Sequence, residues 1–491
     1  MQEKTKEVNK GILLTILILG CFLSMLNQTL MNVALSSLMD IFDVTATTVQ
    51  WLSTGYMLIN GILIPVTAYL MQRFTTRQLF LSSMLFLLAG SIICAAAPSF
   101  SVLLAGRMIQ AVGAGIIIPL LMSVVLAIFP VEKRGGAMGL LGLAVIFAPA
   151  IGPTLSGFIV EYHSWRWLFI GLIPFVVIVI LLAIKFLVNV SETSRSKLDM
   201  LSVLLSTMGF GLILYGFSSA GSKGWGDALV IATLAIGALV TALFCIRQIR
   251  SGDPLLNLSV FNHKIFTLTS LINLLITMMM YADMILLPIY LQKGRGFTAL
   301  EAGLLLLPGA LVNAFMSPIT GKLYDQFGAK PIFITGLLFI IPAMWAVTDL
   351  SASTTYMYLV IRTIFLRLGL SFITMPLNTA GLNALPKELG THGTAVSNTI
   401  RQIAGAIGTA VVITIYTNQA TSHAASLMQN KASTTTEQLK ALASILGASD
   451  AYYFMMILSI AALAITLFIP MKRKISVEQP ANSASKEDSV L

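Results

Sequence analysis

The stretch Ala148-Pro149-Ala150-Ile151-Gly152-Pro153-Thr154-Leu155-Ser156-Gly157 lies inside an apolar segment of membrane length, 137–161. Proline in a helix interior removes a backbone donor and clashes with the preceding turn, so two prolines and two glycines at this spacing should break an ordinary helix. In lipid, backbone groups freed by such a break must be satisfied by neighbouring helices. The stretch therefore predicts a packed membrane bundle in which this segment is a candidate moving part.

The composition places most of the chain in a membrane. Hydrophobic residues make up 57% of the 491 residues and charged residues only 10%, whereas soluble domains contain about 25% charged residues. About fourteen apolar stretches approach the ~20 residues that a helix needs to cross a bilayer. Their approximate limits are 12–35, 50–71, 78–96, 101–127, 137–161, 166–188, 199–219, 226–246, 266–291, 300–320, 331–348, 354–377, 397–417 and 450–470. We therefore expect an all-α polytopic membrane protein.

Positive charge is distributed unevenly between the loops. If the N-terminal tail is cytoplasmic, segments on the inner side contain twenty Lys and Arg residues and segments on the outer side contain six. This bias follows the positive-inside rule and, with an even number of spans, predicts that both termini are cytoplasmic. Membrane topology thus accounts for the net charge of +10, so no nucleic-acid partner is expected. The expected location is the cell membrane of a bacterium.

Residues typical of enzymes and metal proteins do not cluster in the sequence. The three cysteines lie within predicted spans and the four histidines lie in predicted loops without ligand spacing, which argues against a disulfide framework and a metal site. The sequence contains no Walker lysine motif, so an ATP-driven pump is not expected. No span pairs a nucleophile with a base. We expect neither a cofactor nor an enzyme activity.

An internal echo divides the chain into two parts. Residues 68–77 (AYLMQRFTTR) follow the second span, and residues 321–330 (GKLYDQFGAK) follow the tenth with the pattern G-x-L-x-D-x-x-G-x-[KR]. A looser echo pairs Arg107…Gly113…Pro119 with Arg362…Gly369…Pro376. Duplicated bundles are typical of secondary transporters, whose substrate sites lie between the repeats.

The echo implies a domain organisation. We expect an N-terminal six-helix bundle over 1–190 and a C-terminal six-helix bundle over 263–475. Two inserted helices within 191–262 lack the echoes and are interpreted as lipid-facing filler or a scaffold for assembly. Residues 418–449 are rich in Ser, Thr and Ala and are expected to form a polar external segment, with a surface helix or partial disorder as the alternatives. Residues 476–491 are expected to form a cytoplasmic tail.

With these motifs the chain resembles the major facilitator superfamily, and within it the fourteen-span drug/proton antiporter branch. Residues 103–115 (LLAGRMIQAVGAG) are similar to the fourth-span motif, and Gly152-Pro153…Gly157 is similar to the fifth-span motif associated with antiporters. Residues 26–35 (LNQTLMNVAL) resemble the first-span motif of this branch. The resemblance implies two six-helix bundles plus two inserted helices.

Two departures from the family pattern affect the expected mechanism. Many relatives carry an acidic residue where this chain has Asn27, which cannot bind and release a proton. The first loop copy has Gln72 in place of Asp and Thr75 in place of Gly. A charge-relay latch is therefore expected only in the second copy, where Asp325 is retained.

Asp283 is placed deep within a span, roughly 6 Å from its midpoint at 1.5 Å per residue. A carboxylate in the membrane is expensive unless it is paired, hydrated or protonated, and such residues are functional candidates. We assign proton coupling to Asp283, with Arg107 as the basic counterpart in the first bundle. The alternatives are a structural ion pair of Asp283 with Arg362, Arg367 or Arg401, and a helix-packing role for Arg107.

Two of these arginines are also interpreted as interfacial anchors. Arg401 and Gln402 fall in the first turn of the predicted span 397–417, where a snorkelling cytoplasmic side chain is expected. Arg362 fits a snorkelling position if it lies near the outer surface.

Polar and soft apolar side chains near mid-membrane are the candidate substrate contacts, because methionine adapts to varied shapes. They are Asn27, Gln28, Asn32, Tyr56, Asn60, Met280, Tyr281 and Asn313. For any single Asn, hydrogen bonding between helices is the alternative. The candidate motif and gating residues are Arg73, Gln110, Gly113, Gly152, Pro153, Gly157, Gly321, Asp325 and Gly328.

These observations predict a proton-coupled multidrug efflux antiporter that exports amphipathic or cationic organic compounds by alternating access. Its expected partners are protons, small organic substrates and the bilayer, and it is expected to act as a monomer. A lipid or lipid-linked precursor transporter on the same fold is the alternative. A membrane sensor or enzyme is less favoured because no His, Cys or carboxylate cluster is present.

Overall fold

The computed structural model describes residues 10–128, 147–149, 151–190, 199–252, 254, 256–351, 353–386, 389–430 and 436–470, which contain helices and connecting turns and no strand. The first helices are α1 (Lys10–Phe42), α2 (Ala46–Val49), α3 (Trp51–Arg73), α4 (Thr76–Ala96), α5 (Phe100–Ile128), α7 (Trp167–Ile170) and α8 (Leu172–Phe186). The rest are α9 (Met200–Lys223), α10 (Ala228–Arg250), η1 (Leu258–Asn262), α11 (Lys264–Ile289), η2 (Tyr290–Gly294), α12 (Ala299–Phe327), α13 (Ala329–Trp345), α14 (Tyr356–Asn383), α15 (Gly390–Asn430) and α16 (Thr436–Leu467). The all-α expectation is confirmed.

Helices occur at all fourteen predicted spans. Eleven described helices are long and apolar enough to cross a membrane, and Ala329–Trp345 is a shorter apolar helix. The two other predicted spans correspond to α3 and to a helix over 151–162. Residues 137–146 and 150 of the predicted fifth span, 137–161, lie outside the described residues. Pro149 and Pro153 both lie in helical backbone, so the expected break is wrong at these described positions.

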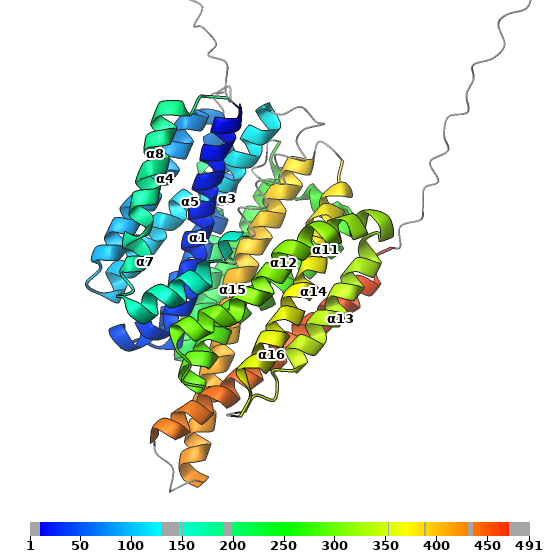
Figure 1. The fold of residues 1–491 in the computed structure, drawn as a ribbon. Helices are drawn as coiled ribbons and strands as arrows, with labels where there is room; N and C mark the ends of the chain where they lie inside the picture. Colours follow the sequence, from blue (N-terminus) through cyan, green and yellow to red (C-terminus); the bar gives the residue numbers. More distant parts are fainter. Residues whose placement is uncertain are drawn as a thin grey trace, which may run out of the picture.

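The helices form two groups with one prominent extension. Figure 1 shows α1 to α8 on one side of the molecule and α11 to α16 on the other; residues 10–190 are called the first half and 264–470 the second half below. The halves meet where α3 packs on α15 and where α1 packs on α11. This arrangement places the middles of α1, α3, α5, α11 and α15 around the centre of the molecule.

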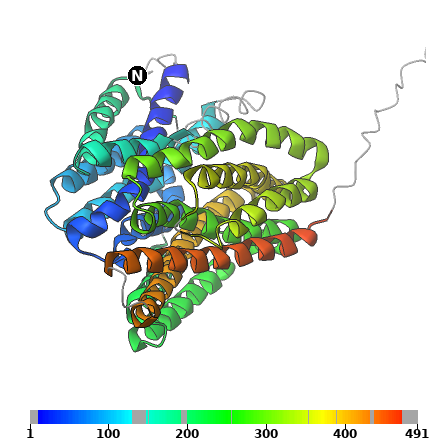
Figure 2. The same ribbon diagram turned by 60° about the horizontal axis from the view of Figure 1, so that its bottom comes forward.

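Of the alternatives for 418–449, the helical one fits the described residues. Most of this segment is helical, because α15 continues to Asn430 and α16 begins at Thr436, and the two extensions project from the bundle as a hairpin (Figure 1). Figure 2 shows α16, orange to red, running along one side of the second half. Tyr416 and Ser444 share a hydrogen bond of 2.7 Å across the hairpin. A Cβ at Gly447 would lie 2.8 Å from the Tyr416 carbonyl oxygen, so the helices are in close contact.

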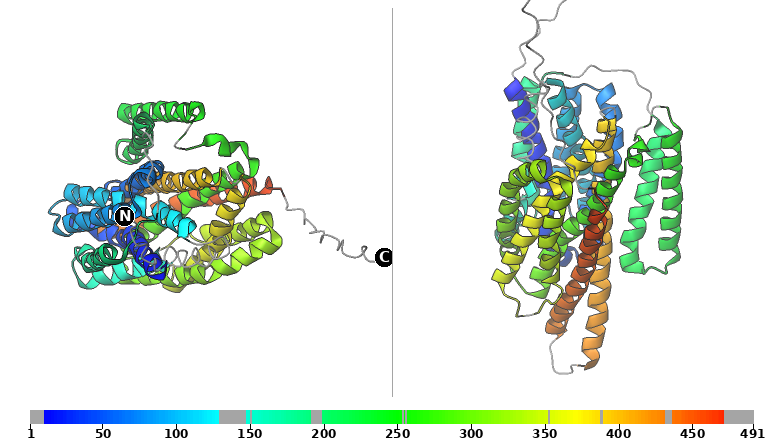
Figure 3. Two further views of the ribbon diagram at one scale, coloured as in Figure 1. Left: turned by 90° about the horizontal axis from the view of Figure 1, so that it is seen from above. Right: turned by 90° about the vertical axis from the view of Figure 1, so that its right-hand side faces the viewer.

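The inserted helices α9 and α10 pack mainly on each other and stand beside the main bundle (Figure 3). Only α9 of the pair packs on α3 and α15, where the halves meet. Leu214 of α9 lies in one apolar cluster with Met57 of α3 and Ala406 of α15. The aromatic rings of Trp51 and Tyr215 are 6.2 Å apart. The exposed α10 fits the interpretation of a lipid-facing helix, whereas α9 packs over the boundary between the halves.

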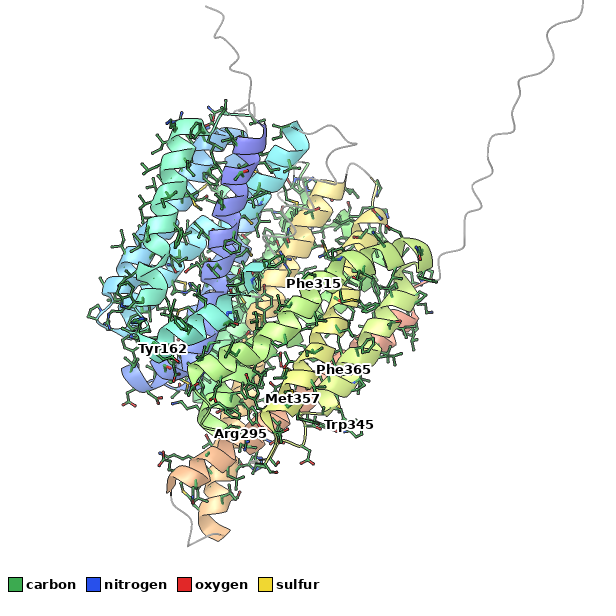
Figure 4. All side chains as sticks on the ribbon, in the orientation of Figure 1. Tyr162, Arg295, Phe315, Trp345, Met357 and Phe365 are labelled. Carbon is green, nitrogen blue, oxygen red and sulfur yellow. The ribbon has the colours of Figure 1, made fainter. Side chains whose placement is uncertain are left out.

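Large apolar side chains lie on the outside of the bundle. Figure 4 labels Tyr162, Phe315, Trp345, Met357 and Phe365 on outward faces of their helices, and all five are exposed. An exterior of this kind suits contact with lipid, where backbone polar groups are satisfied within each helix.

Candidate functional site

The buried arginine of the first half is held by α1, α3 and α5. Arg107 Nη1 donates to the carbonyl oxygen of Asn27 at 3.1 Å, to Asn27 Oδ1 at 3.3 Å and to Gln110 Oε1 at 3.0 Å. Its Nε donates to the Leu52 carbonyl oxygen at 3.4 Å, and its guanidinium carbon lies 4.3 Å from the centre of the Tyr56 ring. These are the carbonyl contacts that a helix-packing role for Arg107 requires.

Small residues allow α5 to carry this arginine close to α4. A Cβ at Gly90 would lie 2.6 Å from the Gly106 carbonyl oxygen, and a Cβ at Gly113 would clash with the Ser83 carbonyl oxygen. The predicted motif residue Gly113 therefore permits close helix packing. Gln110, one turn from Arg107, donates to Ser91 Oγ on α4 at 2.9 Å, which links the arginine to this packing surface.

The second half contains a buried ion pair at mid-helix. Asp283 on α11 accepts a hydrogen bond from Arg362 Nη1 on α14 at 2.8 Å, and both side chains are 1% exposed. The Tyr452 hydroxyl on α16 donates to the same carboxylate oxygen at 3.3 Å. Arg362 Nε donates to the Ala343 carbonyl oxygen at 3.1 Å. Asp283 is therefore tied to three helices, and the snorkelling interpretation of Arg362 is wrong.

The two buried arginines confirm the sequence echo in three dimensions. Arg107 and Arg362 each lie over a tyrosine ring, at 4.3 Å and 4.9 Å. Gly369 repeats the role of Gly113, since its Cβ would lie 2.6 Å from the Gly336 carbonyl oxygen on the neighbouring helix α13. The side chain that accepts from the arginine differs between the halves: it is the Asn27 amide of α1 in the first half and the Asp283 carboxylate of α11 in the second.

A cavity lies between the two halves. Its lining residues differ from those that contact Arg107 and Arg362. The lining residues are Met25, Asn60, Ala114, Gly115, Ile118, Pro119, Asn398, Arg401 and Gln402. Because α15 begins at Gly390, Arg401 lies three turns into the helix rather than in its first turn, and Gln402 is buried. The expectation that these two residues form an interfacial anchor is wrong, because a helix start is poorly marked in the sequence.

The other predicted substrate residues do not share one site. Asn27 and Tyr56 surround Arg107, and Asn60 alone of the eight lines the cavity. Asn313 accepts a hydrogen bond from Ser317 at 3.2 Å to Oδ1; this bond lies within α12 and not between helices. The remaining four are buried Gln28 and Asn32 on α1, and half-buried Met280 and Tyr281 on α11.

The Gly-Pro segment packs across the boundary between the halves. Thr154 Oγ1 donates to the Gly303 carbonyl oxygen of α12 at 3.1 Å. A Cβ at Gly303 would lie 2.6 Å from the Pro153 carbonyl oxygen, and one at Gly157 would clash with the Ala299 carbonyl oxygen. On the other face of the segment, a Cβ at Gly152 would clash with Thr29 of α1. The segment therefore joins α1 and α12 at close range.

Two more polar contacts join the halves near the same end, remote from the N-terminus of α1. Gln292 Nε2 donates to the Val33 carbonyl oxygen at 3.0 Å, and Lys293 forms an ion pair with Asp40. At the opposite end, Arg73 and Asp325 are exposed, and among the described residues Asp325 takes part in no ion pair.

The loop glycines have different roles. Gly328 follows the last residue of α12 with φ of +81°, a conformation that L side chains rarely adopt, so glycine is required there. Nothing lies within 4 Å of a Cβ built at Gly321. The partners Tyr452 and Thr154, and the cavity position of Arg401, escaped sequence reasoning because they depend on which helices become neighbours.

Comparisons with known proteins agree with this architecture. The chain is 41% identical over 448 residues to the lincomycin resistance protein LmrB of Listeria monocytogenes, covering 91% of this chain and 94% of that protein. It is 50% identical over 422 residues (86% and 79% coverage) to the uncharacterized MFS-type transporter YhcA of Bacillus subtilis. It is 28% identical over 433 residues (87% and 85%) to the multidrug export protein EmrB of Escherichia coli.

The fold is shared with solved transporters. A POT family transporter in complex with a thioalcohol-conjugated peptide superposes with a TM-score of 0.66 at 14% identity, covering 93% of this chain and 94% of that one. The model of the Major Facilitator Superfamily matches residues 17–409. With fourteen helical spans and relatives in the drug export branch, this chain belongs to the Major Facilitator Superfamily.

Proposed function

We propose that this transporter is a proton-coupled antiporter that exports amphipathic or cationic organic compounds by alternating access, as a monomer in the cell membrane with both termini in the cytoplasm. Two relatives are named for lincomycin resistance and for multidrug export, which supports drug export. The division into bundles over 1–190 and 263–475, an inserted pair over 191–262 and a tail over 476–491 belongs to this proposal. The buried ion pair of Asp283 and Arg362 is the observation that carries it.

Protonation of Asp283 would change the forces between three helices. The carboxylate joins α11, α14 and α16 through Arg362 and Tyr452, and its second oxygen has no hydrogen-bond partner among the described residues. A buried charge is stable only while it is paired. When a proton neutralises Asp283, the attraction to Arg362 is lost and the contacts between the three helices can rearrange. The pair can therefore link proton binding to helix movement.

The contacts between the halves support a state open toward the cytoplasm. Thr154, Gln292 and Lys293 join the halves near the end remote from the N-terminus. The cavity lies between Asn60, near the middle of α3, and residues 398–402 in the first turns of α15. In the proposed cycle, these remote contacts open when the substrate leaves, and Asp283 takes up a proton from outside.

The test is substrate-driven proton movement in proteoliposomes that contain a pH-sensitive dye. Lincomycin serves as the test substrate, because one relative is named for resistance to it. We expect D283N to lose proton movement, since its amide cannot release a proton. The matched control is D349N, which removes an exposed carboxylate and should behave as the parent does. Unchanged antiport in D283N would refute the coupling role.

A further inference from the structure

We propose that the cavity between α3, α5 and α15 is a substrate subsite that selects organic compounds presenting an anionic group and hydroxyl groups, and that Arg401 makes it unfavourable for permanent cations. This inference deepens the proposed function and rests on it, because it names the substrate class of that exporter. It narrows the expected substrates from amphipathic or cationic compounds to amphipathic compounds that carry an anionic group and hydroxyl groups.

Arg401 supplies a charge with free hydrogen-bonding capacity. It lines the cavity, and its Nη2 donates to Asn398 Oδ1 at 2.9 Å. Its Nε is buried and has no partner among the described residues. Guanidinium is always charged and matches carboxylates and sulfonates with paired donors. An anionic group entering the cavity would satisfy a donor that is otherwise left without a partner.

Two buried amides from different halves line the same cavity. Asn60 on α3 is 2% exposed and Gln402 on α15 is 6% exposed. The side-chain oxygen of each has no partner among the described residues. A buried polar group without a hydrogen-bond partner destabilises the protein, because nothing compensates for the loss of its hydration. Hydroxyl or amide N–H groups of a ligand would pair with both oxygens and so bridge the halves.

The rest of the lining is mostly apolar. Met25, Ile118 and Pro119 contribute hydrocarbon and thioether surface. A Cβ at Gly115 would lie 3.4 Å from Asn60 Oδ1 and 3.0 Å from Leu63 Cβ, so a side chain there would crowd the Asn60 amide. A few placed polar groups on an apolar wall are typical of small-molecule sites.

The balance of charge in the middle of the described spans opposes a cation. Asp283 is the one carboxylate there, and Arg362 already pairs with it. Arg107 is fully buried, and Arg367 is half-buried with an unpartnered Nε. Like charges repel strongly where water is scarce. A permanent cation near Arg401 would meet this field without a carboxylate to neutralise it.

The test measures binding to the purified full chain in lipid nanodiscs by equilibrium dialysis, with empty nanodiscs subtracted. The probes share one pyrene body and differ in the end group: 1-pyrenebutyrate is anionic, 1-pyrenebutanol is neutral, and a pyrenylbutyl trimethylammonium is cationic. We expect the parent to bind the anion about tenfold more tightly than the cation, the scale of one charge-assisted hydrogen bond.

Three variants locate that preference. R401Q should remove most of the preference while binding of the neutral alcohol is retained, which shows that the protein is folded. R401K keeps the charge and should keep most of the preference. R250Q removes an exposed arginine of α10 and should match the parent. Equal binding of anion and cation by the parent, or an unchanged preference in R401Q, would overturn the assignment.

The binding experiment distinguishes a failure of this inference from a failure of the proposed function. No proton gradient is present in the dialysis, and D283N should keep the charge preference of the parent. A preserved preference without proton-driven transport would refute the coupling alone. Proton-driven transport without a charge preference would refute the subsite alone.

Discussion

The two halves of this transporter differ in the chemical groups that hold a buried arginine. Each buries an arginine on a corresponding helix and stacks it on a tyrosine. In the first half Arg107 is held by the Asn27 amide and backbone carbonyls, whereas in the second Arg362 is held by the Asp283 carboxylate. A neutral partner holds the arginine at every pH, but a carboxylate holds it only while deprotonated. Under the proposed function, the first half therefore acts as a support and the second as a switch.

Removing each arginine tests the comparison most strongly. R362Q leaves Asp283 buried without a cation and should lower the free energy of unfolding by about 3–5 kcal/mol. R107Q removes hydrogen bonds to neutral groups and should lower it by about 1–3 kcal/mol. The measurement is thermal unfolding of the purified variants in one detergent at one pH. The double variant D283N/R362Q should recover much of the loss; equal losses from the two single variants would contradict the distinction.

A substitution at the contact between the halves should give the next largest change in the free energy of unfolding. G157A places a methyl group against the Ala299 carbonyl oxygen and should destabilise the protein by about 1–3 kcal/mol. G211A is the matched control, because a Cβ there meets nothing within 4 Å, and alanine should stabilise that helix by roughly 0.5–1 kcal/mol. Thermal unfolding reports both. A neutral result for G157A would show that the segment adapts without strain.

Giving the first half the chemistry of the second should sharpen the comparison. N27D places a carboxylate beside Arg107, with a charge-assisted bond in place of a neutral one, and should stabilise the protein by about 1–2 kcal/mol. It should also add a second group that exchanges protons, so more protons should move per substrate in proteoliposomes. N27Q, which is neutral, serves as the control. An unchanged proton count in N27D would show that position alone does not create coupling.

An exposed ion pair should contribute least. Asp199, at the start of α9, pairs with Arg247 at 2.8 Å, and hydrogen bonds from Arg247 lower the pKa of Asp199 from 3.8 to about 2. Because the pKa is lowered on folding, the stabilisation is complete above pH 3.8 and is lost as the pH falls toward 2.

Solvent screening should keep this contribution small. The unfolding midpoint of D199N should therefore lie slightly below that of the parent at pH 5, and the two should converge as the pH falls toward 2. A difference that stays constant with pH would mean that Asp199 acts through its helix cap on Ser202 instead.

Sequence reasoning identified the buried carboxylate and named Arg362 among its three alternative partners, because a charge inside an apolar span is visible in the sequence. It misplaced Arg401 for want of a clear helix start, since polar residues at 390–398 resemble a loop but are helical. For the same reason it left 418–449 open between a loop and a surface helix. There Tyr416, Ser444 and Gly447 hold the two helices together, and contacts between distant residues overrode the local polarity.

The sequence by itself determined the membrane class, the approximate number of spans and the burial of Asp283, because hydrophobicity and charge placement are local properties. The tertiary structure alone decided that Asp283 meets Arg362 and Tyr452, that Thr154 reaches Gly303, and that Arg401 shares a cavity with Asn60. These pairings depend on the position and rotation of each helix in the bundle, which are set by packing among all the helices together.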